Sequence, residues 1–245
     1  MYNTHMNTQN ITRRPDHGCI LIWGPQAEIF LQGQLTCDVK SCPTFGGYCN
    51  TQGRLISLFR LLQNPLEQDK GYCLECPLEI LESTLHTLKK YAIFSKVTIE
   101  NISQISENIP ELDIGTQINQ LQTLDILSKT PQLTSKTQGM FLPHHVNLPE
   151  LKGVSFNKGC YLGQEIIARM EYRSKIKKHL AIFEYDFDLQ SPLEAGSAIY
   201  HPDHTEPVGH IVNTSKTLIL ASVLDEHCVK ELRVSSITLR PHVGE

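Results

Sequence analysis

The amino-acid sequence predicts an α+β protein, with mixed strands and helices in its N-terminal part and an antiparallel β-barrel at its C-terminus. Three features of the chain predict this fold. Strand-like apolar runs alternate with amphipathic helices over the first hundred residues, a connection rich in Gln, Ser and Thr follows at 101–140, and only short β-type runs occur after residue 179. The 245 residues, 40% hydrophobic and 20% charged, have a globular composition that suffices for two or three small domains.

Residues 1–16 are polar and lack the apolar core of a signal peptide, so we expect a flexible leader or a late translation start. No apolar stretch approaches the length that a membrane helix needs. The formal net charge of -4 gives no overall field that would attract nucleic acid. We therefore expect a cytoplasmic protein that contacts neither a membrane nor nucleic acid directly.

The N-terminal region, 17–174, predicts helices at 26–35 and 77–91, of which the second has apolar residues at i, i+3 and i+4 spacing. Apolar runs bounded by Gly, Pro and polar turns predict strands at 18–23, 45–50, 54–62, 70–76 and 93–99. Strands on both sides of helices favour layers of ferredoxin-like type. The connection near 101–140 contains one helix candidate at 117–128, and it leaves open whether the region forms one or two subdomains.

The C-terminal region, 175–245, holds β-type runs separated by turn residues, at 179–187, 196–201, 207–213, 217–224 and 229–240. Regular short strands without helices predict a small antiparallel barrel or sandwich. No internal repeat is present.

The eight cysteines stand mostly in strand-like surroundings, and in a cytoplasmic protein we expect buried free thiols. Cys73 and Cys76 form a CxxC without a second pair, and Pro77 follows directly, so neither a zinc site nor a thioredoxin-like helix is expected. His201 and His204 lack a third ligand in the sequence and predict surface residues. We expect no metal site.

Residues 152–169 read KGVSFNKGCYLGQEIIAR. Val154 and Phe156 predict a short strand, the glycines a tight turn, and the residues from Gln164 onward a helix. Cys160 then lies near a helix N-terminus with Lys158 two residues away, and both features favour the thiolate. Such a thiolate is suited to act as nucleophile, one-carbon acceptor or soft metal ligand. Without a family resemblance, however, the residues alone favour a packed core thiol with glycines that serve only the turn.

The string KGCYLGQEIIAR closely resembles the K-G-C-Y-x-G-Q-E-x-x-x-R signature of the YgfZ family. Its flanks resemble the family too, in Phe141-Leu142-Pro143 and in Gly153-Val154-Ser155-Phe156. Upstream, residues 30–38 (FLQGQLTCD) and 49–55 (CNTQGRL) are similar to the family's F-L-Q-G-Q-x-T-x-D and C-x-x-x-G-R elements. The resemblance covers roughly residues 18 to 240 in the family's order.

This resemblance implies a fold like that of the glycine-cleavage aminomethyltransferase, or T-protein: a ring of α/β (ferredoxin-like) layers plus the C-terminal barrel. It implies bound tetrahydrofolate and support of the assembly or repair of iron–sulfur enzymes, including radical enzymes that thiolate tRNA. The expected partners are folate and iron–sulfur client proteins, and we expect a monomer. By position, Cys160 is the reactive group, with Lys158 beside it.

Several residues are candidates for folate binding: Tyr161, Gln164, Glu165, Arg169, Arg173, Lys175, Asp38 and Arg54. Arg173, Lys175 and Lys177 alternate, so on a strand they would share one face and receive a carboxylate tail. The alternative is a solvated, charged strand edge. Asp38 and Arg54 match family positions, but helix capping or surface pairing is the favoured explanation for them. His145 and its neighbour His144 precede the motif and are candidates for a base that faces Cys160.

Whether the chain is an enzyme stays open. T-proteins carry an Asp pair after a glycine turn, in the pattern G-G-x-x-D-D, whereas this chain reads Leu55-Ile56-Ser57-Leu58 after Gly53-Arg54. Without those carboxylates the folate amine has no group to hold and polarise it. Aminomethyl transfer is therefore the weaker alternative, and a non-catalytic scaffold that holds a partner is a third.

Overall fold

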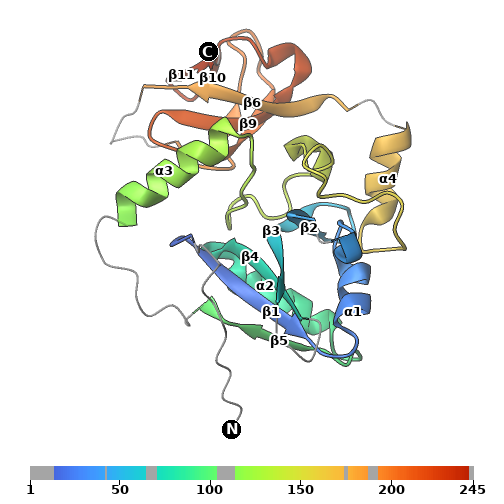
Figure 1. The fold of residues 1–245 in the computed structure, drawn as a ribbon. Coiled ribbons are helices and arrows are strands. Elements are labelled where there is room, and N and C mark those ends of the chain that lie inside the picture. The colour runs from blue at the N-terminus through green and yellow to red at the C-terminus, as the bar shows by residue number, and fades with distance from the viewer. Residues whose placement is uncertain are drawn as a thin grey trace.

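A computed structural model describes residues 14–41, 43–64, 71–103, 114–173, 176–186 and 193–242 of the chain. Two antiparallel sheets organise these residues. The first sheet lies in the N-terminal part and carries helices on one face, and the second forms the C-terminal part (Figure 1).

The first sheet has five strands in the order β2-β3-β4-β1-β5. Its members are β1 (His17–Trp23), β2 (Phe45–Cys49), β3 (Leu55–Asn64), β4 (Gly71–Pro77) and β5 (Thr98–Asn101). Each pair of neighbouring strands in it is antiparallel, and β4 lies at the centre between β3 and β1. The order β3-β4-β1-β5 with a helix after β1 and another after β4 is the ferredoxin-like arrangement predicted from the sequence.

Helices α1 (Ala27–Gln34) and α2 (Leu78–Tyr91) cover one face of this sheet. Alternate residues of β1, Ile20 and Ile22, pack with Leu81 and Leu88 of α2 in one buried cluster. Those leucines recur at helical spacing, which explains why the amphipathic pattern identified α2 correctly. A 3₁₀ turn, η1 (Val39–Ser41), follows α1.

The strand predicted at 93–99 is correct only at its end, because β5 begins at Thr98. The Ser95 N–H donates to the Ala92 carbonyl, which turns the chain back from α2 toward the sheet edge. Ile93 and Phe94 are exposed, so the apolar run in this segment does not reflect burial in a sheet. Residues 154–156 likewise form no strand.

The second sheet has six strands in the order β10-β11-β6-β9-β8-β7. They are β6 (Lys178–Glu184), β7 (Ala198–Ile199), β8 (Gly209–Thr214), β9 (Leu218–Leu224), β10 (Leu232–Val234) and β11 (Ile237–Pro241), with a 3₁₀ turn η4 (Asp225–His227) after β9. The backbones of Tyr200 and Arg233 exchange two hydrogen bonds of 2.9 Å, which join the ends of the sheet into a near-closed barrel. The run predicted at 229–240 is two strands, since Ser235 adopts a positive φ of 53° between them.

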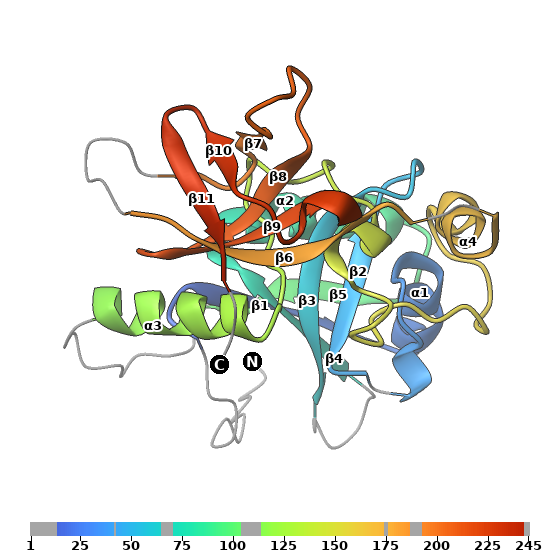
Figure 2. The ribbon, with the colours of Figure 1, turned by 90° about the horizontal axis from the view of Figure 1, so that it is seen from above.

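The connection between the two sheets contains α3 (Ile114–Leu127), a 3₁₀ turn η3 (Pro143–Val146) and α4 (Gln164–Arg173). Both views place α3 along the barrel and α4 at the opposite side of the molecule (Figures 1 and 2). A buried cluster that includes Leu58, Leu148 and Leu180 joins the hairpin β2–β3, the connection and the outer face of the barrel.

The last residues of the predicted leader form ion pairs with the rest of the chain. Arg14 forms ion pairs with Asp16 and with Asp125 of α3, so these residues hold the start of β1 against the connection. Residues 1–13 lie outside the described part of the chain. Among the described residues, no helix is both long and apolar enough to pass through a bilayer.

Candidate functional site

Lys158 joins the segment 158–165 to the loop that follows α1. Its ammonium group donates to the backbone carbonyls of Leu35 and Cys37, both at 2.8 Å, and lies 5.0 Å from the centre of the Tyr161 ring. Burial lowers the pKa of Lys158 to about 8, and the neighbouring Cys37 and Asp38 offset this only in part. Lys158 therefore fixes the position of the segment, in addition to any effect on its reactive group.

Cys160 is exposed on this segment, where a ligand or partner can reach it. It lies in the turn before α4, which begins at Gln164 as the sequence predicts and extends to Arg173. Two of the Lys158 N–H groups are directed to carbonyl oxygens. The exposure suits a reactive thiol, and the reactivity of Cys160 stays a prediction.

The hydroxyl of Thr36 connects the segment after α1 to the residues just before the motif. It donates to the Gly153 carbonyl at 2.6 Å and accepts from the Gly47 N–H at 2.9 Å, and all of these groups are buried. The Ser155 N–H donates to the Thr36 carbonyl at 2.9 Å, so the backbones of the two segments are joined as well. Buried groups that are fully hydrogen-bonded in this way fix the two segments rigidly.

Gly163 lets the motif approach the β2–β3 hairpin. It has a φ of 81°, and a Cβ atom at this position would lie 2.6 Å from the Asn50 carbonyl oxygen and 2.9 Å from the Gly53 Cα. Only glycine fits this backbone conformation and this space. Residues 33–38, 50–54 and 153–163, which we call the segment junction, thus bring together parts of the chain that resemble the YgfZ family and lie far apart in the sequence.

Other predicted folate-binding residues have local partners. The Asp38 carboxylate accepts from Gln32 Nε2 at 2.7 Å and from the Lys40 N–H at 3.0 Å, which is the capping alternative. Glu165 and Arg169 are exposed on α4 and pair with each other at 3.0 Å. The role of these residues in folate binding stays a prediction.

Tyr161 is buried, and its hydroxyl has no hydrogen-bond partner in the described part of the chain. Burial raises the pKa of this hydroxyl. Gln164 is half-buried at the start of α4. Arg173 is exposed and ends α4, so the strand on which it was expected to alternate with Lys175 and Lys177 is wrong, and Lys175 lies outside the described residues.

A cavity of about 340 Å³ opens where the β2–β3 hairpin, the connection and the barrel meet. We call it the junction cavity; it is lined by Arg54, Met140, Phe141, His145, Lys178, His210 and Ser222. Arg54 begins β3 and donates to the Met140 carbonyl at 2.6 Å. Of these residues, the resemblance pointed to Arg54 alone as a ligand contact.

The junction cavity is lined by two cations, Arg54 and Lys178, and by two histidines whose protonation is disfavoured. Burial lowers the pKa of His145 to about 4, and Lys178, Arg54 and His144 lower it further. Burial also lowers the pKa of Lys178, with a further contribution from Arg54, and that of His210, with a further contribution from Lys178. The basic side chains of the cavity thus repel one another's positive charge, and a bound anion would offset this repulsion.

His144, the other candidate for a base, is buried. Its Nε2 atom pairs with Glu171 of α4 at 3.1 Å, and its Nδ1 atom has no hydrogen-bond partner among the described residues. His144 thus links η3 to α4, whereas His145 faces the junction cavity. The two neighbouring histidines therefore serve different parts of the molecule.

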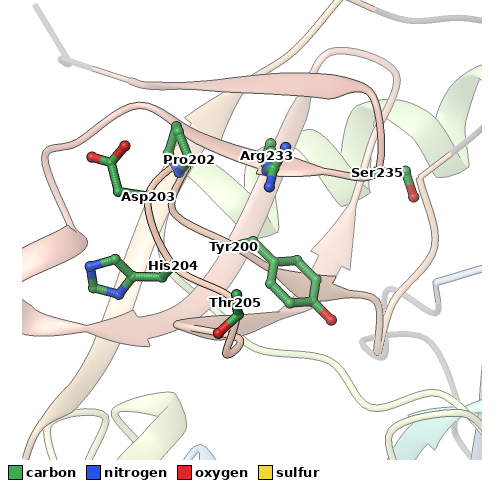
Figure 3. A pocket seen from close by; sticks show the side chains of 7 residues that line it. All are labelled: Tyr200, Pro202, Asp203, His204, Thr205, Arg233 and Ser235. Atoms are coloured by element: carbon green, nitrogen blue, oxygen red, sulfur yellow. The ribbon is translucent and has the colours of Figure 1, made fainter.

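A third histidine joins the pair predicted as surface residues. The buried ring of His227 lies 5.1 Å from that of His201 and 5.3 Å from that of His204, next to a cavity of about 550 Å³ at the end of the barrel. Figure 3 shows His204 and Asp203 on the turn of this cavity, opposite Arg233. No group of three His, Cys, Asp or Glu residues in the described part of the chain is arranged to hold a metal ion.

The expectation of buried thiols holds for most of the cysteines that the structure describes. Five are buried, Cys228 is half-buried and Cys160 is exposed. Cys73 and Cys76 stand three residues apart on β4 and therefore point to opposite faces of the sheet. Cys42 lies outside the described residues.

Comparison with solved structures defines the class of fold. The aminomethyltransferase T of the glycine cleavage system from Bartonella henselae matches with a TM-score of 0.65 over 94% of this chain and 84% of that chain, at 12% identity. The chain therefore has the fold of aminomethyltransferase T, and the predicted α+β fold with its C-terminal barrel is confirmed.

Sequence comparison then gives the family. A tRNA-modifying protein YgfZ from Vibrio atlanticus is 30% identical over 225 residues, which cover 70% of this chain and 68% of the relative. Another, from Photobacterium profundum, is 31% identical over 68% of this chain and 67% of the relative. An uncharacterized protein from Haemophilus influenzae is 32% identical over 74% of each chain. No family profile matches the chain. The chain belongs to the YgfZ family of tRNA-modifying proteins.

Proposed function

We propose that this chain is a tetrahydrofolate-binding accessory protein that supports the assembly or repair of iron–sulfur enzymes, including radical enzymes that thiolate tRNA. It acts in the cytoplasm as a monomer, with iron–sulfur client proteins as partners. The observation that supports the proposal is the segment junction, which brings together family-like residues at 33–38, 50–54 and 153–163 and leaves Cys160 exposed beside them. A site built for folding alone has no need of an exposed thiol.

Aminomethyl transfer finds less support. Ser57 and Leu58 stand where the T-protein pattern places its Asp pair, and both are buried on β3. Neither side chain can accept a proton from a folate amine as a carboxylate does. The proposal therefore assigns the chemistry of this chain to the Cys160 thiol.

Titration of the purified protein with tetrahydrofolate tests the binding half of the proposal. We expect saturable binding at micromolar to millimolar ligand, and its absence throughout this range would contradict the proposal. Formation of methylenetetrahydrofolate from an aminomethyl donor, measured with the same preparation, would instead favour transfer.

Replacement of the thiol tests the other half. In cells that lack the native protein, we expect Cys160→Ser to lose the activity of iron–sulfur enzymes that depend on it. Cys228→Ser is the matched control, because Cys228 is half-buried and lies on the barrel, away from the motif. Full activity with Cys160→Ser would refute the role of the thiol.

A further inference from the structure

We propose that the junction cavity is a binding site for a multiply charged oxyanion. Under the proposed function, on which this assignment of the source rests, the anion is the γ-glutamyl tail of folate. Free phosphate shares the same chemistry and is the other source. The site is distinct from Cys160, which is not among the residues that line this cavity.

The composition of the cavity wall supports an anion. Arg54 and Lys178 contribute two cations, His145 and His210 contribute two imidazoles that can donate hydrogen bonds, and none of the lining residues is acidic. Neither Arg54 nor Lys178 forms an ion pair within the described part of the chain. Cations that approach one another without a carboxylate between them raise the local potential and attract counter-ions.

Three of the side chains that line the cavity, those of Lys178, His210 and Ser222, lie on one face of the barrel. His210 on β8 lies directly opposite Ser222 on β9, which lies opposite Leu180 on β6. Lys178, two residues before Leu180, shares that face because side chains alternate along a strand. The barrel thus presents an amine, an imidazole and a hydroxyl from adjacent strands to the same volume.

The Ser222 hydroxyl adds an independent observation. Ser222 is only 1% exposed, and its Oγ atom has no hydrogen-bond partner among the described residues although it lines the cavity. Leaving a buried hydroxyl without a hydrogen-bond partner is unfavourable, so we expect a bound molecule in the cavity to provide one. An oxyanion would accept the hydroxyl proton as a hydrogen bond.

Hydrogen bonds to the connection fix Arg54 beside the cavity. One of its guanidinium nitrogens donates to the Met140 carbonyl, and the neighbouring Leu55 N–H donates to the Phe141 carbonyl at 2.8 Å. These bonds fix the guanidinium at the cavity mouth and leave further N–H groups for carboxylate or phosphate oxygens. A volume of about 340 Å³ suits a few carboxylates or a phosphate rather than a whole pterin with its tail.

Isothermal titration at pH 6.5 with tri-γ-glutamate tests the proposal directly. We expect saturable binding that Lys178→Met weakens about tenfold or more, as for loss of a charged hydrogen bond. Lys178→Arg should retain binding because it keeps the charge. Lys177→Met is the matched control, since Lys177 is the exposed neighbour outside the cavity and its loss should change nothing.

Two further titrants separate the sources of the anion. Binding of inorganic phosphate with the same dependence on Lys178 would assign the site to free phosphate. Tetrahydrofolate triglutamate that binds more tightly than the monoglutamate, only while Lys178 is present, would assign it to the folate tail. If tri-γ-glutamate binds but no folate does, the oxyanion site stands and the proposed function falls.

The proposal is overturned if neither tri-γ-glutamate nor phosphate binds saturably, or if Lys178→Met and Lys177→Met behave alike. Folate that binds equally with one or three glutamates and regardless of Lys178 would also overturn it, while leaving the proposed function intact. If Lys178→Met fails to fold, His210→Gln provides the same comparison within the cavity.

Discussion

Substitution of Gly163 by alanine should destabilise the protein strongly, because two separate costs meet at this position. A non-glycine residue at its φ of 81° costs about 1–2 kcal/mol. The added Cβ would also lie 2.6 Å from the Asn50 carbonyl oxygen, and overpacking of this kind costs about 1–3 kcal/mol. Backbone on both sides leaves little room for relaxation, so we expect a total of about 2–5 kcal/mol.

Two other glycines separate these costs. Gly139 has a positive φ of 77° but nothing within 4 Å of a Cβ, so Gly139→Ala should cost only about 1–2 kcal/mol. Gly159 has open space and no positive φ, so Gly159→Ala should stay within about 0.5 kcal/mol of the wild type. Urea unfolding, followed by circular dichroism and by fluorescence of the single tryptophan, Trp23, measures all three variants. If Gly163→Ala costs no more than Gly139→Ala, the close approach at the segment junction does not constrain the fold.

Three further predictions concern single groups. Thr36→Val should lower the free energy of unfolding by about 2–5 kcal/mol in urea, because both buried hydrogen bonds of the hydroxyl are lost. Thr36→Ser keeps the hydroxyl and should retain most of the wild-type stability. Equal stability of the two variants would contradict the role of the hydroxyl. Because the folded pKa of His145 is about 4 against an ordinary value of 6.5, the unfolded chain binds more protons in between, so wild-type stability should fall as the pH drops from about 6.5 to 4. His145→Gln should flatten that fall, and unchanged pH dependence would show that His145 titrates normally. Iodoacetamide with native protein should label Cys160 fastest and Cys228 more slowly, as mass spectrometry of the digested protein would show, and rapid labelling of the buried cysteines would contradict the packing described here.

The elements that sequence predicted well have a local signal. The leucines of α2 recur on one helical face, and the strands β6 and β9 alternate or run continuously apolar because the barrel buries them. The errors occur where exposed apolar residues imitate a strand, as at Ile93 and Phe94, or where one residue with positive φ divides a run, as at Ser235. Neither feature has a periodicity that sequence reasoning could use.

Sequence reasoning likewise identified one part of the candidate site, the motif, and missed another, the junction cavity. The motif was identifiable because its residues are contiguous, and its contacts to Leu35 and Thr36 explain why the upstream stretch resembles the family as well. The junction cavity was not identifiable, because Arg54, Lys178 and His210 come from three elements that meet only in the folded chain. The one available signal was polar residues, His210 and Ser222, within otherwise apolar strands of the barrel.

The structure also changes what the motif means. Of its residues, Lys158, Tyr161 and Gly163 are engaged in building the segment junction, through carbonyl contacts, burial and close backbone approach. Those roles would be needed in any chain with this fold and this junction, whatever its chemistry. Cys160 is different, because it is exposed and no described hydrogen bond requires a thiol there. Cys160 is therefore the residue proposed to react, and the basic wall of the junction cavity is the surface proposed to bind. It follows that loss of function in a Lys158 variant would not by itself implicate Lys158 in catalysis, whereas loss in a correctly folded Cys160 variant would implicate the thiol.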